Sequence, residues 1–425
     1  MIIYCSGIGG IGLSAYAAFQ KHAGHTVLGS DRADSVLLMD LRSQGIGIFL
    51  QQDGSQIPSD ADLFVYSEAI PASSSERVRA AELGIPQKTY FEALGELTMP
   101  FRLISVAGTH GKSSTTAMAA KVLMDSSLDP SVIVGTKLKD LGGRNWRYGK
   151  STLFVAESCE YRRSFRFLHP SIILLTNADG DHFDYYTSQE DYESAFMDFV
   201  KSLPDDGLLI THLSDPACAK IAALAGRRTI DADLETLPEL SVSGLHMRKN
   251  AQLVLSLAGE LHLSRPEVLS SLRAFSGTWR RMEVRGTRSD GVTVVDDYAH
   301  HPAEIRATLQ GMREQFPGRR LVVVFQPHTH DRTLKLYQDF LTAFTGADMV
   351  IISYVYEARS DRDSGKVDLP RFIADLQKGS GVQVIDGHSL SEIEQKLRQG
   401  ILKSDDVLIT MGAGDVTELA GRILG

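Results

Sequence analysis

Cysteine is scarce in this sequence. The 425 residues include three cysteines, Cys5, Cys159 and Cys218, and they lie far apart along the chain. This number and spacing fit neither a framework of disulfide bonds nor the paired ligands of a zinc site. We therefore expect a reducing compartment, and the cytoplasm is the simplest one.

Long hydrophobic runs are also missing. The longest apolar stretches, such as Leu321–Phe325 and Met349–Ile352, have the length of a strand, whereas a membrane-spanning helix needs about 20 residues. The N-terminus runs from Met1 directly into Ile2, Ile3 and Tyr4, without a basic segment followed by an apolar one. We expect neither membrane insertion nor an export signal.

The chain has no excess of positive charge. Lysine and arginine total 44 against 53 acidic residues, which gives a net charge of −9. This balance argues against nucleic acid as a partner. Any anionic ligand must therefore be held by local loops, and small-molecule substrates are the expected partners.

What the sequence does contain is an alternation of short β-branched runs with amphipathic stretches, which predicts an α/β fold with mostly parallel sheets. A length of 425 residues exceeds a single core, so we expect two or three domains. The chain restarts with a strand and a polar loop after residues 98 and 282, which predicts segments 1–98, 99–282 and 283–425. The predicted strands are Ile2–Cys5, Thr26–Gly29, Ile46–Leu50, Leu63–Tyr66, Arg102–Ala107, Leu153–Ala156, Ile172–Thr176, Val292–Asp296, Leu321–Phe325, Met349–Ile352, Val382–Ile385 and Val407–Thr410.

A glycine loop follows the first predicted strand. Gly7, Gly9 and Gly12 have the spacing of the dinucleotide fingerprint, and Asp31 ends the next strand. Such a loop binds a pyrophosphate at a helix N-terminus, but the pattern leaves NAD, FAD and a UDP-sugar open as ligands.

A second glycine loop, from Gly108 to Ser114, lies between the predicted strand Arg102–Ala107 and a predicted helix at Thr115–Met124. Backbone N–H groups of such a loop face phosphate oxygens, a lysine contacts the β and γ phosphates, and a serine hydroxyl can bind Mg²⁺. Val106 stands where the full pattern has a glycine. The alternative is a glycine turn with an exposed lysine, which the strand, loop and helix context disfavours.

Acidic residues follow two strands of the second segment. Glu157 and Glu160 come after one strand, and Asp179, Asp181, His182 and Asp184 come after the next. Ligands bind at strand ends in open α/β sheets, and Mg²⁺ needs few protein ligands besides phosphate. Glu157 and His182 are the candidate ligands, whereas Asp179 and Asp184 fit a solvated loop equally well.

The third segment has two polar loops after strands, Asp296–Pro302 and Gln326–Thr333, and a glycine turn at 411–415. Asp331 or Thr333 could cap a helix instead of binding a ligand. One histidine of each loop could likewise be an exposed side chain without a ligand. The glycine turn is as consistent with a plain structural turn as with a ligand contact.

Taken in order, these motifs resemble the Mur ligases of peptidoglycan synthesis over almost the whole chain. The resemblance is carried by the loop from Gly108 to Ser114, Glu157, Asn177 with Asp181 and His182, Arg280 with Arg281, and the run Asp297–Pro302. It implies three domains: a Rossmann-like N-terminal domain for a UDP-sugar, a central P-loop ATPase domain, and a Rossmann-like C-terminal domain for the amino acid. It also implies an ATP-dependent, Mg²⁺-dependent ligase, working as a monomer or homodimer, that activates a carboxylate as an acyl phosphate.

Within the family, His110 and the paired histidines resemble most the branch that joins L-alanine to the lactyl carboxylate of UDP-N-acetylmuramate. By position, the resemblance implies catalytic roles for Lys112, Glu157, His182 and Arg332. It implies metal ligands at Ser113, Glu157 and His182. The implied ATP-binding residues are Gly108, Thr109, His110, Gly111, Lys112, Ser113, Ser114, Asn250, Arg281 and Asp297. The implied UDP-sugar residues are Gly7, Gly9, Gly10, Gly12, Asp31 and Ser67, and the implied amino-acid residues are Tyr298, His300, His328 and Arg332.

The chain departs from the family pattern in its acidic run. The usual Glu-Ala-Asp-Glu-Ser-Asp reads Glu157-Ser158-Cys159-Glu160-Tyr161-Arg162, so a thiol and a cation replace two aspartates. Glu160 and Tyr161 resemble a sister branch that attaches a whole tripeptide during murein recycling, which stays an alternative. An NAD-dependent dehydrogenase is a more distant alternative, because that function would give the loop that contains Lys112 no ligand to bind. A nucleotide-binding sensor without turnover is a third.

Overall fold

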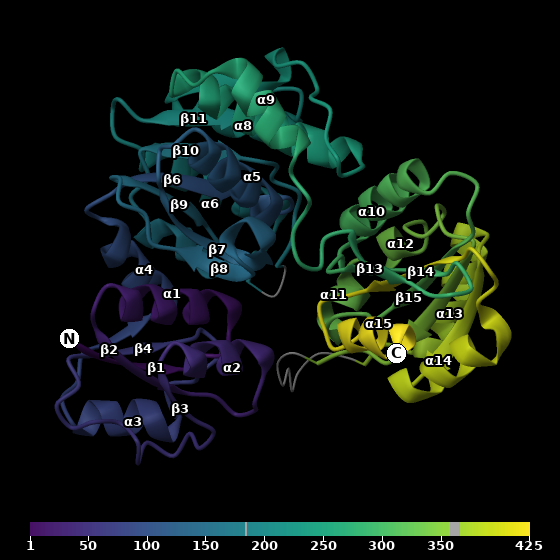
Figure 1. The fold of residues 1–425 in the computed structure, drawn as a ribbon, viewed down its shortest axis with the longest axis horizontal. Coiled ribbons are helices and arrows are strands. Elements are labelled where there is room, and N and C mark those ends of the chain that lie inside the picture. Colours follow the sequence, from purple (N-terminus) through teal and green to yellow (C-terminus); the bar gives the residue numbers. More distant parts are fainter. Residues whose placement is uncertain (183–184, 358–365) are drawn as a thin grey trace. The chain divides into compact units, whose positions relative to one another are not determined.

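The structure is a computed structural model that describes residues 1–182, 185–357 and 366–425. Three sheets follow one another along the chain, and helices flank each of them (Figure 1), so the predicted α/β class is confirmed. Residues 1–181, 188–239 and 250–275 form one compact unit, and Ser276–Gly425 forms the main part of a second. No helix in the described ranges is long and apolar enough to cross a membrane.

The first sheet is a parallel, Rossmann-like sheet with the strand order β3-β2-β1-β4-β5. Its strands are β1 (Ile2–Ser6), β2 (Thr26–Ser30), β3 (Gly47–Phe49), β4 (Leu63–Tyr66) and β5 (Gln87–Thr89), and its helices are α1 (Ile11–His22), α2 (Val36–Ser43), α3 (Ser75–Glu82) and α4 (Tyr90–Thr98). The order reverses between β1 and β4, so the loop after β1 opens at a topological switch point, where ligands bind in such folds.

The second sheet, in the same unit, has the order β12-β11-β10-β6-β9-β7-β8 and is parallel except for β8. Its strands are β6 (Arg102–Ala107), β7 (Ser131–Leu138), β8 (Arg144–Arg147), β9 (Leu153–Glu157), β10 (Ile172–Leu175), β11 (Leu208–Thr211) and β12 (Arg228–Asp231). Its helical segments are α5 (Lys112–Asp125), η1 (Lys139–Leu141), η2 (Tyr161–Phe167), α6 (Gln189–Lys201), α7 (Pro216–Ala225), η3 (Ala232–Leu234), α8 (Leu245–Glu260) and α9 (Arg265–Arg273). Because β6 lies between β9 and β10, the loops that follow these three strands open at the same edge.

Helix α1 packs between the first sheet and the β7–β8 hairpin, which explains why its residues from Leu13 to Gln20 are all buried. The Phe19 ring contacts the rings of Trp146 and Phe154, and the Asn145 side chain donates to the Ile11 carbonyl over 2.7 Å. The first two sheets are therefore joined by a shared hydrophobic core and are not separated by a solvated linker.

The third sheet has the order β13-β14-β18-β15-β16-β17 and is parallel except for β13. Its strands are β13 (Glu283–Thr287), β14 (Thr293–Asp297), β15 (Leu321–Phe325), β16 (Met349–Ser353), β17 (Gln383–His388) and β18 (Val407–Met411). Its helical segments are α10 (Pro302–Gln315), α11 (His330–Lys335), α12 (Tyr337–Phe340), α13 (Leu369–Ser380), α14 (Leu390–Lys396), η4 (Leu397–Ile401) and α15 (Thr417–Leu424).

Alternate residues along the strands of the third sheet supply two separate cores. Val295 and Val323 pack with α10, α12 and α13 on one face, whereas Val294 and Val324 pack with α14 and α15 on the other. A sheet buried on both faces requires strands that are apolar at every position. Strand β15 meets this requirement at every position. Strand β18 is also fully buried, and the hydroxyl of its one polar residue, Thr410, donates to Asp296.

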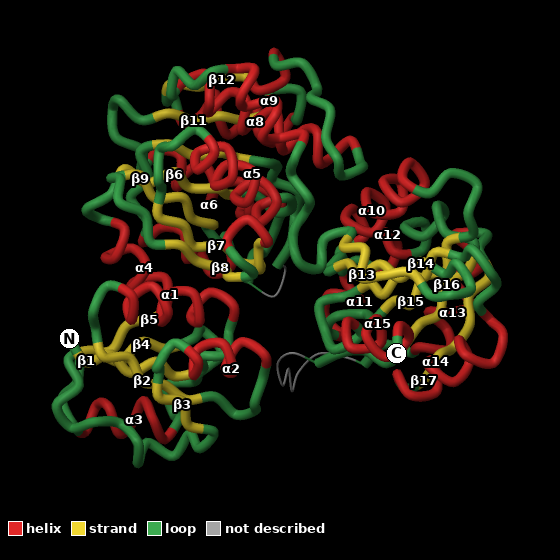
Figure 2. Tube along the Cα trace, in the orientation of Figure 1, coloured by secondary structure: helices red, strands yellow, loops and turns green. Residues whose placement is uncertain are grey.

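All twelve predicted strands are found, each within three residues of its predicted ends, and Figure 2 shows them alternating with helices. The prediction missed β5, β7, β8, β11, β12 and β13. Strands β5 and β12 are short and polar, and β8 and β13 are antiparallel strands at sheet edges. The missed β11 is fully buried and apolar but has only 4 residues, a length at which periodicity does not separate strand from helix.

The contact between α4 and η2 gives a test of packing. An ideal Cβ at the buried Gly95 would lie 2.2 Å from the Phe167 carbonyl oxygen, and a backbone atom cannot yield cheaply. We expect Gly95→Ala to lower the free energy of unfolding by about 1–3 kcal/mol, measured by urea denaturation.

Gly259 in α8 serves as the matched control, because nothing lies within 4 Å of its ideal Cβ. Gly259→Ala is expected to raise the unfolding free energy by about 0.5–1 kcal/mol through helix propensity. Equal effects of the two substitutions would contradict the packing described for Gly95.

Candidate active site

The loop between β6 and α5 has the backbone of an anion cradle. Gly108 and Gly111 adopt φ angles of 138° and 82°, which side chains rarely tolerate. An ideal Cβ at Gly108 would collide with Thr176, and one at Gly111 would lie 2.7 Å from the Asn250 Oδ1 atom. The N-terminus of α5 has no side-chain cap, so its first N–H groups suit a phosphate.

Residues at the end of β10 hold this loop in place. The His110 N–H donates to Asn177 Oδ1 over 2.9 Å, and the Asn177 amide and the Thr176 hydroxyl both donate to the His110 carbonyl. The Thr109 hydroxyl lies 2.8 Å from that of Tyr192 on α6. The end of β10 and helix α6 therefore fix the cradle, and Asn177 acts as its anchor.

Lys112 is the first residue of α5, and its ammonium group turns back into the loop. Nζ donates to the carbonyls of Gly108 and Thr109 and lies 2.9 Å from a carboxylate oxygen of Glu160. Burial lowers the pKa of Lys112, but the Glu160 charge raises it and the net shift is upward. The lysine therefore carries a full positive charge where phosphates would bind.

The predicted metal ligands are placed at strand and helix ends. Glu157 ends β9 and accepts the Gly135 N–H over 2.6 Å, and Ser113 lies in the first turn of α5. The described residues contain no group of three His, Cys, Asp or Glu side chains that could hold a metal. A hydroxyl and a single carboxylate do fit Mg²⁺, which takes its other ligands from phosphate and water.

The position of His182 relative to Glu157 remains a prediction. His182 has a φ angle of 55°, and its carbonyl accepts the N–H groups of Tyr185 and Tyr186. It belongs with the second compact unit, whereas Ser113 and Glu157 belong to the first. Asp184 lies outside the described residues.

The glycine loop after β1 brings together the residues predicted for a UDP-sugar. The N–H groups of Gly7 and Ile8 donate to the Ser30 carbonyl, and the Gly9 N–H donates to Asp31 over 2.8 Å. An ideal Cβ at Gly7 would lie 3.0 Å from Ser67. Gly10 is the N-cap of α1 without a side-chain cap bond, and Gly12 faces the Tyr90 ring.

A buried carboxylate below this loop was missed by the sequence. Glu76, from α3, is 1% exposed and accepts hydrogen bonds from the hydroxyls of Tyr4, Ser6 and Ser30. These contacts tie the carboxyl ends of β1 and β2 together. Its only sequence signal is the Ser74 cap two residues earlier, which predicts a helix start rather than a buried acid.

In the second unit, Tyr298, His300, His328 and Arg332 form one cluster. The ring centroids of Tyr298 and His300 are 5.4 Å apart, and those of His300 and His328 are 5.6 Å apart. Arg332 Nη1 lies 3.0 Å from His328 Nδ1. Tyr356, which the sequence did not indicate, stacks on His328 at 5.9 Å and lies against Gly414, so the third glycine turn makes room for this ring.

The helix caps differ from those that the sequence suggested. Thr329 caps α11 by accepting the Arg332 N–H, whereas Asp331 and Thr333 lie inside the helix, so capping by either is wrong. His301 is buried and caps α10 by accepting the Ala303 N–H over 3.2 Å. Glu304 completes this cap by accepting the N–H groups of His300 and His301.

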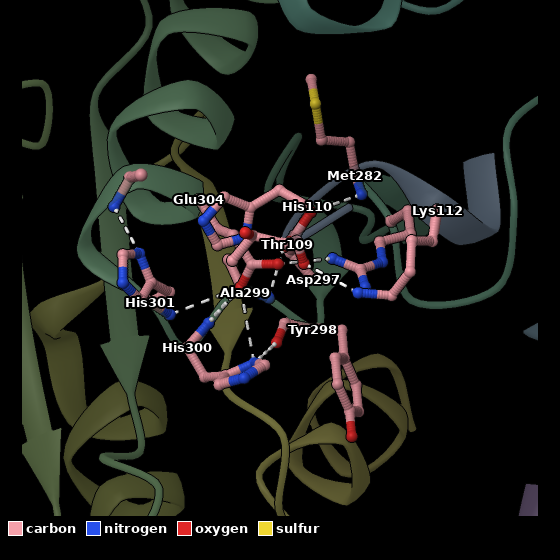
Figure 3. Close-up of polar contacts among 12 residues, drawn as sticks. Thr109, His110, Lys112, Met282, Asp297, Tyr298, Ala299, His300, His301 and Glu304 are labelled. Carbon is pink, nitrogen blue, oxygen red and sulfur yellow. Dashed lines mark hydrogen bonds and ion pairs between the residues drawn. The ribbon is translucent and has the colours of Figure 1, made fainter. Parts of the chain in front are cut away.

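Asp297 ends β14 in a buried polar pocket. Figure 3 shows its carboxylate with the N–H groups of Met282 and Ala299, at 2.6 and 2.7 Å. Burial raises the pKa of Asp297 to about 6, because lost hydration outweighs the nearby Arg281 charge and the two N–H donors. Arg281 also pairs with Glu304 at 3.3 Å. Arg280, by contrast, is buried and binds the Gly412 carbonyl and Asp296, which is a structural role.

Known families match successive parts of the chain. The Mur ligase family catalytic domain matches residues 2–102, the Mur ligase middle domain matches 106–257, and the Mur ligase glutamate ligase domain matches 280–414. A UDP-N-acetylmuramate--L-alanine ligase of Clostridium novyi is 37% identical over 99% of this chain and 97% of its own length. That of Lachnospira eligens is 36% identical over 99% and 97%.

Solved structures agree over the full length. UDP-N-acetylmuramate-alanine ligase MurC from Thermotoga maritima matches with a TM-score of 0.82 and 28% identity, over 100% of this chain and 98% of that one. A murein peptide ligase from Psychrobacter arcticus matches with a TM-score of 0.76 and 22% identity, over 100% and 98%. The second match shows the fold alone, and the first also shows the three-domain architecture.

The raised pKa of Asp297 predicts a pH dependence of stability. Its pKa of about 6 in the folded chain exceeds the ordinary value of 3.8, so the folded chain keeps a proton that the unfolded chain releases. The resulting stabilisation is complete below about pH 4 and is lost as the pH rises through about 6. Across this window, we expect the unfolding free energy of the wild type to fall relative to Asp297→Asn by about 2–3 kcal/mol.

Urea denaturation at several pH values between about 4 and 7 measures this difference. Asp290→Asn is the control, because Asp290 lies on an exposed turn. Parallel stability curves for the wild type and Asp297→Asn would show that the carboxyl group titrates normally.

Proposed function

The chain belongs to the Mur ligase family, and from this we propose that it joins L-alanine to the lactyl carboxylate of UDP-N-acetylmuramate, with cleavage of ATP to ADP and phosphate. Two relatives named for this reaction are 37% and 36% identical to this chain, which aligns with 97% of the length of each. The product is a precursor of peptidoglycan.

The phosphate loop is the observation that carries the proposal. Two glycines in left-handed conformations, an uncapped helix N-terminus and a largely buried lysine converge within the segment 108–114. Each is a device for binding phosphate, and together they suit the β and γ phosphates of a nucleotide. A dehydrogenase would use only the loop after β1 and would leave this second cradle without a ligand.

In the first half of the reaction, an oxygen of the lactyl carboxylate attacks the γ phosphorus of ATP. The bond from that phosphorus to the β,γ-bridging oxygen breaks, which releases ADP and leaves an acyl phosphate. Lys112 and the first N–H groups of α5 hold the phosphates and stabilise the charge that develops on their oxygens. In this proposal Thr109, His110 and Ser114 shape the cradle, and Asn250, Arg281 and Asp297 bind the nucleoside.

Magnesium is part of the proposal. Ser113 and Glu157 would hold one ion and His182 a second, and the ion supplies charge neutralisation and alignment of the phosphate oxygens. The pairing of one hydroxyl with one carboxylate supports the first position, because Mg²⁺ takes its other ligands from water and phosphate.

In the second half, the amino group of L-alanine attacks the acyl carbon, phosphate leaves, and the nitrogen loses a proton. We assign the amino acid to the cluster of Tyr298, His300, His328 and Arg332, whose side chains lie together. A guanidinium suits the substrate carboxylate.

We place the UDP-sugar at the loop after β1, with Gly7, Gly9, Gly10, Gly12, Asp31 and Ser67. The topological switch point next to β1 and the paired contacts of Gly9 with Asp31 support this assignment. The three functional segments are then 1–98 for the UDP-sugar, 99–282 for ATP and 283–425 for the amino acid.

Replacement of the loop lysine tests the proposal directly. We expect Lys112→Ala to lower kcat by roughly 10²–10³, because the ammonium no longer offsets the charge on the phosphates. Formation of ADP is measured with Mg²⁺, UDP-N-acetylmuramate and L-alanine. Lys121→Ala on the same helix is the control, since Lys121 pairs with Asp125 and Asp140 and should leave kcat unchanged.

The same assay separates the alternatives. Glycine, L-serine and a murein tripeptide replace L-alanine in parallel reactions. A response to the tripeptide alone would favour the recycling ligase, and no ADP with any amine would contradict the proposed function.

The amino-acid pocket gives a further prediction. Arg332→Ala is expected to raise the KM for L-alanine by about 100-fold, because loss of a charged hydrogen bond costs about 1.5–3 kcal/mol, while the KM for ATP stays within about twofold. Arg371→Ala, on the exposed start of α13, is the control. An equal change in both KM values would show that Arg332 acts on the fold instead of on the amino acid.

A further inference from the structure

Glu160 lies in the nucleotide site, but the reaction described above gives it no task. Its side chain is 2% exposed, and its two carboxylate oxygens lie 2.9 and 3.1 Å from Lys112 Nζ. Together with the carbonyls of Gly108 and Thr109, it provides an acceptor for each of the three ammonium protons. A phosphate can therefore bind Lys112 only by replacing one of these acceptors.

Of the three acceptors, the Glu160 side chain is the one that can yield. The carbonyls of Gly108 and Thr109 belong to a loop that β10 and α6 hold through His110 and Thr109. A carboxylate at the end of a side chain moves by rotation about single bonds, whereas the pinned backbone does not.

A turn directly after Glu160 fixes the position of its side chain. Two successive residues after it, Arg162 and Arg163, adopt left-handed φ angles of 52° and 56°, and such conformations persist only where surrounding contacts enforce them. The Arg163 guanidinium supplies these contacts, since it binds Asp191 at 2.7 Å and Asp198 at 3.1 Å on α6. The Arg163 N–H also donates to the Glu160 carbonyl over 2.8 Å. A strained turn clamped to α6 thus holds the carboxylate against the lysine.

We propose that Glu160 is a positioning residue that holds the Lys112 ammonium in the empty site and makes nucleotide binding depend on a divalent cation. This inference rests on the proposed binding of a nucleotide at the loop. When Lys112 turns to a phosphate, its ion pair with the buried Glu160 carboxylate weakens, and weakening a buried ion pair is costly.

A bound cation removes this cost. Glu157 and Glu160 both act electrostatically on Lys112, so these two carboxylates oppose the approach of a metal-free polyphosphate to the lysine. A divalent cation next to Glu157 offsets the charge of both the phosphates and the two carboxylates. Removal of the Glu160 charge should therefore strengthen binding of the metal-free nucleotide far more than binding of the metal-bound nucleotide.

Calorimetric titration of the full chain with ADP tests this, once with Mg²⁺ and once with EDTA. For Glu160→Gln we expect metal-free ADP to bind on the order of tenfold more tightly than to the wild type, while the Kd with Mg²⁺ changes by less than about threefold. Glu193→Gln is the matched control, because Glu193 on α6 is a largely buried carboxylate paired with Lys220 of α7 and its replacement should leave both Kd values unchanged.

Each other outcome overturns the inference. Unchanged or weaker binding in EDTA would show that Glu160 only supports the fold, and a loss confined to Mg²⁺ would make it a metal ligand. Failure of the wild type to bind ADP even with Mg²⁺ would instead refute the proposed function.

A second variant covers the case in which Glu160→Gln is too unstable to titrate. Arg163→Lys loosens the clamp on α6 and leaves both Glu160 and Lys112 in place. It should shift metal-free binding in the same direction by about twofold to threefold, and no shift would count against the inference.

Discussion

A largely buried ammonium needs acceptors, and the loop around Lys112 supplies two of them. The glycine conformations at 108 and 111 turn two carbonyls and the start of α5 toward one point, and Asn177 and Thr176 fix the loop from the neighbouring strand. Because the loop satisfies the charge before any ligand arrives, binding is an exchange of partners instead of the filling of a void.

The parallel sheets explain how residues distant in sequence meet. Strands β6, β9 and β10 end at one edge, so the phosphate loop, the acidic run and Asn177 become neighbours. The third sheet repeats the arrangement, with Asp297 at the end of β14, His328 after β15 and the glycine turn after β18. One geometric rule, ligands at the carboxyl ends of parallel strands, thus accounts for all three loop clusters.

The sequence predicted the parts of this architecture that have local signals. Apolar runs located the central strands, and glycine spacing located both nucleotide-type loops. Contacts made by distant side chains left no such signal: the burial of Glu76 and the stacking of Tyr356 on His328 both depend on tertiary neighbours. The pairing of Glu160 with Lys112 also lay beyond reach, because it requires a strained turn that no residue in the run announces.

Helix α1 has an implication for how this chain can vary. Its inner face serves the first sheet and its outer face serves β8, where Phe19, Trp146 and Asn145 interlock. The first hundred residues are therefore not an exchangeable cassette. A hybrid gene that took these residues from a relative would also need the matching β7–β8 hairpin from that relative. Substitutions in α1 and in the hairpin are therefore expected to be coupled.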